Sequence, residues 1–163
     1  MSGYGIGRYG AGNLPDATTG LTGAVLPAHE RTILIGGTLH ATDLTDLWAY
    51  AGGEFQSARP QFALIGKTLY VSGLGNYLYS NLACEIETPA PFRAPAATTC
   101  SGQTKDVRVV EGGVWHTMYA GDFGKLKLGL QYTYAQRDGF FGIGGSPKGT
   151  ENAVFTSFRY FPF

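Results

Sequence analysis

Residues 125–137 read KLKLGLQYTYAQR and alternate between two kinds of side chain with a period of two. Successive side chains of a β-strand point to opposite faces, so the pattern predicts a strand with one apolar and one polar face. The apolar positions are Leu126, Leu128, Leu130, Tyr132 and Tyr134. The polar positions include Lys125, Lys127, Gln131 and Arg137. Leucines followed by tyrosines are typical of a strand that passes from hydrocarbon into a headgroup layer, with the polar residues facing a lumen.

The composition of the 163 residues also favours a β-rich chain in contact with lipid. Only 15% of the residues are charged, whereas about 25% is usual in soluble domains. No apolar run approaches the roughly 18 residues of a membrane helix, so a membrane would have to be crossed by strands. Twelve basic and twelve acidic residues cancel, and we expect no nucleic-acid partner.

Other parts of the chain also have the pattern or composition of strands. Together with 125–137 they give six expected membrane strands, at 4–9, 32–41, 47–55, 106–119, 125–137 and 151–163. In 106–119 the apolar residues do not alternate, so its two faces stay unassigned. The apolar segment 62–71 is either a strand extension or one arm of a hairpin above the membrane.

The connections between these strands alternate in length. Short turns are expected at 42–46 and 121–124, and long segments at 10–31, 56–105 and 138–150. Outer-membrane barrels have short periplasmic turns and long external loops. The sequence therefore predicts a periplasmic C-terminus and an external loop at 56–105.

Four blocks of sequence resemble uncharacterised large outer-membrane proteins of proteobacteria. They are YGIGRYGAGNLPD (4–16), DLWAYAG (46–52), GLQYTY (129–134) and VFTSFRY (154–160). The aromatic end of the chain, with Phe158, Tyr160 and Phe163, resembles the assembly signal of bacterial outer-membrane barrels. The resemblance implies the bacterial outer membrane as location, and lipid and the barrel assembly machinery as partners, but no activity. Phe163 is out of step with Phe158 and Tyr160, which predicts a bulge near Pro162.

We therefore expect an all-β chain that forms an antiparallel transmembrane β-barrel, or the C-terminal part of one, as a single domain over 1–163. Six strands are fewer than the eight of the smallest common barrels, and Met1–Ile6 lacks the features of a signal peptide. Both observations favour the C-terminal portion of a larger barrel. Unpaired sheet edges are costly in hydrocarbon, so the chain alone should aggregate, form a homo-oligomer that pairs its edges, or add a hairpin from 62–79 and close as eight strands.

Cys84 and Cys100 are the two cysteines of the chain and lie in the same long segment. In an oxidising compartment two such cysteines usually pair, whereas in the cytosol they would be free thiols. For an exported protein the sequence predicts a disulfide.

Signals of enzymatic or cofactor chemistry are weak. Residues 5–10 match the dinucleotide motif G-x-G-x-x-G, but no helical pattern follows them, as that motif requires. The histidines His29, His40 and His116 do not have the spacing of a zinc site. Glu85 and Glu87 lie near a cysteine, where a solvated loop explains them. We expect neither a catalytic, metal nor cofactor site, and no enzymatic activity.

Three classes of function are compatible with these patterns. The first is an outer-membrane barrel that acts as a porin-like passive pore or a surface scaffold. The second is a soluble small barrel that binds a hydrophobic ligand, because the same alternation can be turned inside out. The third is a surface adhesin that binds through its long loops. The clustered tyrosines and the aromatic terminus favour the first.

Overall fold

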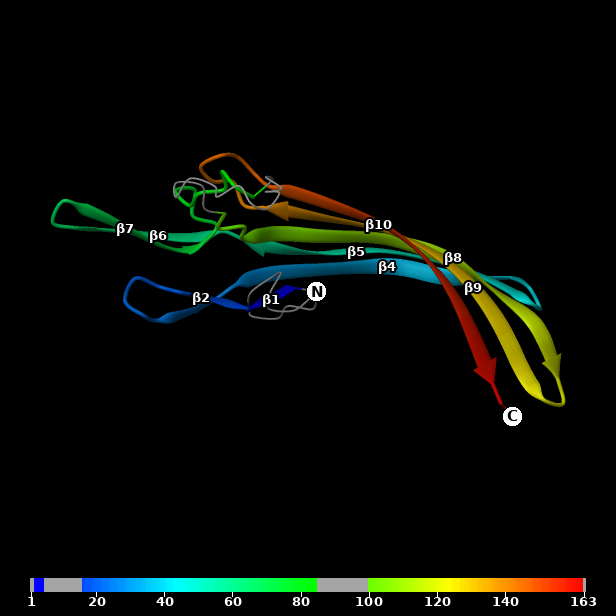
Figure 1. Cartoon of the computed structure of the whole chain (residues 1–163). Coiled ribbons are helices and arrows are strands. Elements are labelled where there is room, and N and C mark those ends of the chain that lie inside the picture. Colours follow the sequence, from blue (N-terminus) through cyan, green and yellow to red (C-terminus); the bar gives the residue numbers. More distant parts are fainter. Residues whose placement is uncertain (1, 5–15, 85–99, 163) are drawn as a thin grey trace. The chain divides into compact units, whose positions relative to one another are not determined.

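The computed structural model describes residues 2–4, 16–84 and 100–162, and in these it is all-β. Its elements, shown in Figure 1, are β1 (Ser2–Tyr4), β2 (Ala17–Thr19), β3 (Val25–Pro27), β4 (His29–Thr42), β5 (Thr45–Ser57), β6 (Arg59–Ile65), β7 (Thr68–Leu74), β8 (Thr104–Gly121), β9 (Gly124–Gly139) and β10 (Lys148–Phe161). The described part of the chain holds no helix that is long and apolar enough to cross a membrane. The all-β prediction is confirmed.

The main sheet has six strands in the order β1-β4-β5-β8-β9-β10. β1 is antiparallel to β4, with Ser2 opposite Arg31 and Tyr4 opposite His29. β4 and β5, and likewise β8 and β9, are joined by two-residue turns at 43–44 and 122–123. Over the described residues the sheet is open, with β1 and β10 at its ends, and no closed barrel is formed.

Two hairpins form small sheets of their own. β2 pairs with β3, and β6 pairs with β7 in a register that sets Arg59 opposite Leu74 and Ile65 opposite Thr68. The apolar segment 62–71 is thus the end of a hairpin, with parts of both arms and the turn at Gly66 and Lys67, and it is not an extension of β5. Because this hairpin lies outside the six-stranded sheet, it does not supply a seventh and eighth strand.

Most of the predicted strands are present, but they are longer than predicted. β4, β5, β8 and β9 each extend by one to three residues beyond both predicted ends, and β10 begins at Lys148 instead of residue 151. The turns shorten accordingly. Polar residues at strand ends still take part in the ladder, since strand pairing uses the backbone. Of the expected strand 4–9, only Tyr4 lies within the described residues. Phe163 lies outside them, so the bulge expected near Pro162 stays a prediction.

The faces of β8, which the sequence left unassigned, become clear from its contacts with β9. Gln131 of β9 bonds Glu111 of β8, and Arg137 of β9 bonds Thr104 of β8. The two β9 residues are an even number of positions apart, whereas the two β8 residues are an odd number apart. One of the two strands therefore gains a residue between these contacts, as in a β-bulge. A shift of this kind accounts for the broken alternation at 109–115.

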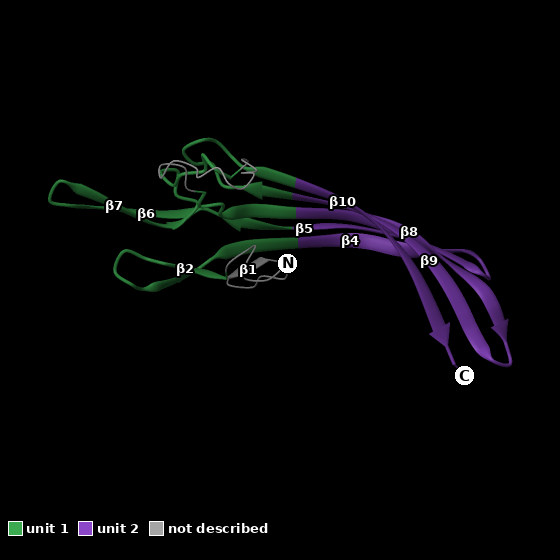
Figure 2. Cartoon of the chain, in the orientation of Figure 1, with its two compact units in different colours: residues 1–32, 54–107, 137–149 green, residues 33–53, 108–136, 150–163 purple. Residues whose placement is uncertain are grey.

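The chain divides into two compact units, which Figure 2 colours separately. Unit 1 comprises residues 1–32, 54–107 and 137–149, and unit 2 comprises residues 33–53, 108–136 and 150–163. The buried apolar residues Ala28, Leu74 and Phe140 all belong to unit 1. So do most of the buried polar residues, which are Glu30, Glu54, Gln56, Asn76, Asn81, Thr104 and Asp106.

Candidate functional site

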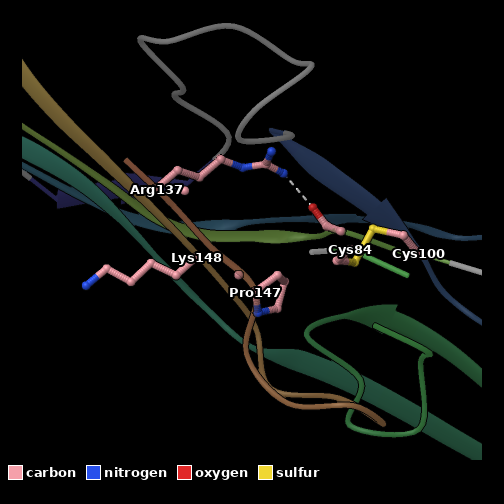
Figure 3. A pocket seen from close by; sticks show the side chains of 8 residues that line it. Cys84, Cys100, Arg137, Pro147 and Lys148 are labelled. Carbon is pink, nitrogen blue, oxygen red and sulfur yellow. Dashed lines mark hydrogen bonds between the residues drawn. A yellow bond between two sulfur atoms is a disulfide. The ribbon is translucent and has the colours of Figure 1, made fainter. Parts of the chain in front are cut away.

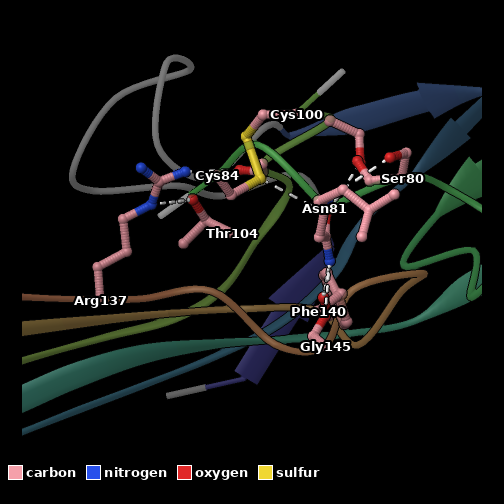
Figure 4. The surroundings of a disulfide bond; sticks show 11 residues. Ser80, Asn81, Cys84, Cys100, Thr104, Arg137, Phe140 and Gly145 are labelled. Carbon is pink, nitrogen blue, oxygen red and sulfur yellow. Dashed lines mark hydrogen bonds between the residues drawn. A yellow bond between two sulfur atoms is a disulfide. The ribbon is translucent and has the colours of Figure 1, made fainter. Parts of the chain in front are cut away.

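The predicted disulfide is present in unit 1. Cys84 and Cys100 are joined with a Cα–Cα distance of 4.8 Å (Figure 4). Residues next to the two cysteines are also joined by hydrogen bonds. The Ser101 amide donates to the Ser80 carbonyl, and the Ser101 hydroxyl donates to Asn81 Oδ1 at 3.1 Å. The covalent bond thus ties together two segments that also hydrogen-bond to each other.

Asn81 connects this pair of segments to the β9–β10 loop. Its side-chain amide donates to the carbonyls of Phe140 and Gly145, both at 2.9 Å, and its backbone amide donates to the Ile143 carbonyl. Figure 4 shows Asn81 between the disulfide and this loop. Asn81 is 8% exposed, so each of these bonds is shielded from water. The residue holds the loop to the disulfide-linked segments through the fixed geometry of one amide.

A hollow of about 150 Å³ lies beside the disulfide (Figure 3). Arg137 reaches into this region, where its guanidinium donates to the Thr104 hydroxyl at 2.7 Å and to the Gly102 carbonyl at 2.6 Å. The Nε–H group and one Nη2–H group are therefore used by the protein itself. Arg137 therefore has a structural role beside the disulfide in unit 1, separate from the other predicted lumen residues Lys127 and Gln131, which lie in unit 2.

On one face of unit 2, polar side chains of neighbouring strands pair with one another. Asp46 binds His40 Nδ1 at 2.6 Å and Lys127 Nζ at 3.2 Å. The hydrogen bond with His40, followed by that with Lys127, holds the pKa of the Asp46 carboxyl below its ordinary value. Asp46 lies next to the β4–β5 turn, before the apolar side chains of β5 begin at Leu47. Further along the same face, Gln131 Nε2 donates to Glu111 at 3.1 Å.

Three aromatic rings lie on this same face, each over a glycine of the adjacent strand. A Cβ added at Gly113 would approach the Trp48 ring to 2.9 Å, and one added at Gly129 would approach the Trp115 ring to 2.5 Å. Tyr50 covers Gly36 in the same way. Any side chain larger than hydrogen would displace the ring. The glycines therefore fix where the rings lie, as in the covering of sheet glycines by aromatic residues in other β proteins.

The rings and the polar groups together line a shallow depression of about 380 Å³ within unit 2. Its lining residues are Thr38, Asp46, Trp48, Tyr50, Glu111, Trp115, Gln131 and Arg159. Trp48 and Tyr50 are in contact, with ring centroids 5.9 Å apart at 45°, and the Arg159 guanidinium lies 4.2 Å from the centre of the Trp115 ring. We call this surface the aromatic depression.

The opposite face of unit 2 is apolar and exposed. Residues at alternate positions of five strands contribute to it, and the most open are Ile33, Ile35, Leu39, Leu47, Val110, Met118, Leu130, Tyr132, Val154, Phe158 and Tyr160. Phe158 is 75% exposed and Ile35 72%. Monomeric soluble proteins seldom expose so many large apolar side chains on one face. We call this surface the apolar face.

The predicted apolar and polar residues of β9 lie on opposite faces of the strand, as expected from their alternation. Leu130 and Tyr132 are each 50% exposed, while Leu126, Leu128 and Tyr134 are half-buried. Lys127 and Gln131 bond polar residues of other strands, and Lys125 is exposed. Whether the two faces meet lipid and a lumen remains a prediction. Near the C-terminus the Tyr160 hydroxyl bonds the Phe123 carbonyl, and Phe163 lies outside the described residues.

Glu111, Trp115 and Arg159 cannot be recognised as a group in the sequence alone. The sequence signal that could reveal this group is a match of aromatic residues with glycines. Trp48 and Tyr50 are two positions apart on one strand and so share a face, as do Gly113 and Trp115 on the next strand. Such a match is visible only when the strand order is known.

The remaining residues that were considered as metal, cofactor or catalytic groups either bond other side chains or lie outside the described residues. His40 bonds Asp46, and His116 bonds the Thr45 hydroxyl at 2.9 Å. Within 2–4, 16–84 and 100–162 no three His, Cys, Asp or Glu side chains gather as metal ligands would. The glycine motif at 5–10, Glu85 and Glu87 lie outside the described residues. Comparison of the chain with protein families, curated proteins and solved structures finds no match.

Proposed function

We propose that this chain is a β-barrel protein of the bacterial outer membrane, or the C-terminal part of one, and acts as a passive, porin-like pore. The observation that carries the proposal is the contrast between the two faces of unit 2. The apolar face is exposed, whereas the opposite face gathers the paired polar groups. A barrel in lipid needs this arrangement, since its outside meets hydrocarbon and its inside meets water.

The lengths of the strands support the proposal. Leu126 to Tyr134 covers nine residues, and Ile33 to Ala41 also covers nine. A tilted transmembrane strand needs about 9–11 residues. Along β4 the alternate positions change from Arg31 to Ile33 and Ile35, as expected where a strand enters hydrocarbon from a polar layer. Both strands therefore carry an apolar segment of about the thickness of a bilayer.

The connections support a definite orientation. The two-residue turns at 43–44 and 122–123 belong to unit 2, whereas the connections 58–103 and 140–147 belong to unit 1. Short turns face the periplasm in outer-membrane barrels and long loops face outward. In this proposal the disulfide, which lies in the connection 58–103, is on the external side.

A soluble carrier would use the same alternation with the apolar residues inside. In unit 2, however, the apolar side chains include the most exposed ones, and Trp48, Glu111 and Trp115 on the other face are half-buried. A carrier would need a second layer over the apolar face. Lipid provides such a cover without further protein, and for this reason we favour the barrel.

The edge strands of the sheet must also be paired in lipid, because an unpaired backbone group costs several kcal/mol there. We propose that the edge at β10 pairs either with further strands of a longer barrel or with a second copy of the chain. Phe158 and Tyr160 on β10 would first be recognised by the barrel assembly machinery.

The proposal is tested by recovering the protein from membranes in detergent and comparing its gel migration with and without heating. A folded barrel should migrate differently before heating, and its mass in detergent distinguishes a monomer from an oligomer. In planar bilayers it should give stepwise ion conductance. A protein that is recovered in aqueous buffer without detergent and does not change conductance would contradict the proposal.

A further inference from the structure

We propose that the aromatic depression is a binding site for a neutral linear saccharide, which the pore would guide or pass. The inference deepens the proposed function and rests on it, because it takes the aromatic depression to face water in the lumen. Its volume of about 380 Å³ falls within the usual range of small-molecule sites, about 300–1,000 Å³. No other hollow described above combines several aromatic rings with charged groups of both signs.

The rings provide flat apolar surfaces that are already in position. Trp48 and Trp115 are held over Gly113 and Gly129, so they lie along the sheet instead of standing away from it. A sugar ring has C–H groups on its faces and hydroxyls around its rim, and the C–H faces pack on aromatic rings. Because the protein rings are fixed before binding, little conformational entropy is lost when a sugar settles on them.

Polar groups at the edge of these rings match the hydroxyls. Arg159 and Gln131 are donors, and Glu111 and Asp46 are acceptors. Hydroxyls can both donate and accept, so a saccharide can use both kinds of group. In addition, the Trp48 indole N–H is buried and has no hydrogen-bond partner among the described residues. Buried indole N–H groups usually have one, and a water or ligand hydroxyl would supply it.

The charges favour a neutral ligand. Two carboxylates, Asp46 and Glu111, face two cations, Arg159 and Lys127, so the group has no net charge. Asp46 is bound by His40 and Lys127, and the Arg159 guanidinium lies on the Trp115 ring. A charged ligand would have to break these pairs and leave a charge without its partner, which is costly. A neutral polyhydroxylated ligand can bind beside them.

The two tryptophans allow a direct test, since they are the only ones in the chain. The detergent-solubilised protein is titrated with maltohexaose and with cellohexaose, two neutral glucose oligomers that differ in linkage, while tryptophan fluorescence is followed. The Trp115→Phe variant reports on Trp48 alone. We expect a saturable change with at least one of the two sugars. Glu111→Gln should weaken this binding about tenfold, because a hydrogen bond to a charged group is lost.

Lys105→Gln is the matched control, since Lys105 is exposed and belongs to unit 1. It should bind like the parent. Choline chloride tests the alternative that the rings and carboxylates form a cage for an organic cation. A response to choline and not to the sugars, or no saturable response to any probe, would overturn the saccharide site. Heat-modifiable migration of the same sample shows whether the barrel proposal survives, and its loss would overturn both.

Discussion

Unit 1 holds nearly all of the buried polar side chains of the described residues, among them Glu30, Gln56 and Asn81, whereas exposed apolar side chains occur in both units, such as Leu64 in unit 1 and Phe158 in unit 2. Unit 1 is held by a disulfide and by buried hydrogen bonds such as that from Gln56 to Glu30, at 2.7 Å. Unit 2 relies on the sheet ladder and on the rings that cover its glycines. Continuous strands run through both units, so the difference lies in the side chains. The two units therefore differ in how their side chains are held in place.

The largest expected effect comes from placing a charge on the apolar face. Leu128→Arg should lower the free energy of unfolding in lipid by about 2–4 kcal/mol, the cost of an arginine near the bilayer midplane. Gln131→Arg, on the opposite face of the same strand, should be tolerated. Denaturant titrations of both variants refolded into vesicles measure the difference. Equal stability of the two variants would remove the distinction between the faces.

Removal of the disulfide should affect unit 1. In the chain-entropy model, closing a loop of about 15 residues contributes about 3 kcal/mol, so Cys84→Ser combined with Cys100→Ser should lose about that amount. Hydrogen exchange should show faster opening at Asn81 and Ser101 and unchanged protection in β9 at Leu128 and Leu130. Equal loss of protection in both regions would show that the two units do not open separately.

A smaller effect is expected where a ring lies over a glycine. Gly129→Ala should destabilise unit 2 by about 1–3 kcal/mol, because the new methyl group meets the Trp115 ring. Gly37→Ala is the control, since nothing lies within 4 Å of the added atom. Thermal unfolding of both variants, and of Gly129→Ala combined with Trp115→Ala, measures the effect. The double variant should lose less than the sum of the two single changes.

The smallest effect concerns Asp46. Its folded-state pKa is lowered, so its stabilising contribution is present above the ordinary value of 3.8 and is lost as the pH falls through the folded-state pKa. Asp46→Asn should therefore be slightly less stable than the parent at pH 7, and the difference should disappear on acidification below pH 3.8. Denaturation midpoints at several pH values provide the measurement. A difference that grew in acid would contradict the assignment.

Strands with a clean period of two could be predicted from the sequence. β9 alternates almost without error and β4 does so apart from Leu34, and two cysteines in one segment leave a single possible pair. β8 could not be assigned to faces, because the change of parity between its contacts with Gln131 and Arg137 interrupts the regular pairing with β9. Local pattern shows which residues share a face only while the register is regular.

The aromatic depression could not be predicted in this way. Trp48 and Gly113 are far apart in the sequence, and their contact exists only because β5 and β8 are neighbours in the sheet. β5 and β8 are separated by the hairpin β6–β7 and the disulfide-linked segment, so the strand order is not evident from the order along the chain. Likewise, a pattern of residues does not reveal how exposed the apolar face is.

The disulfide also has a consequence for changes in the chain itself. It holds Cys84 and Cys100 with their Cα atoms 4.8 Å apart, whatever the number of residues between them. Lengthening a closed segment costs little entropy, about 0.6 kcal/mol for each doubling. An epitope tag or a foreign peptide added between Cys84 and Cys100 would therefore leave both attachment points in place, because they are held by the bond and by the contacts of Ser80, Asn81 and Ser101.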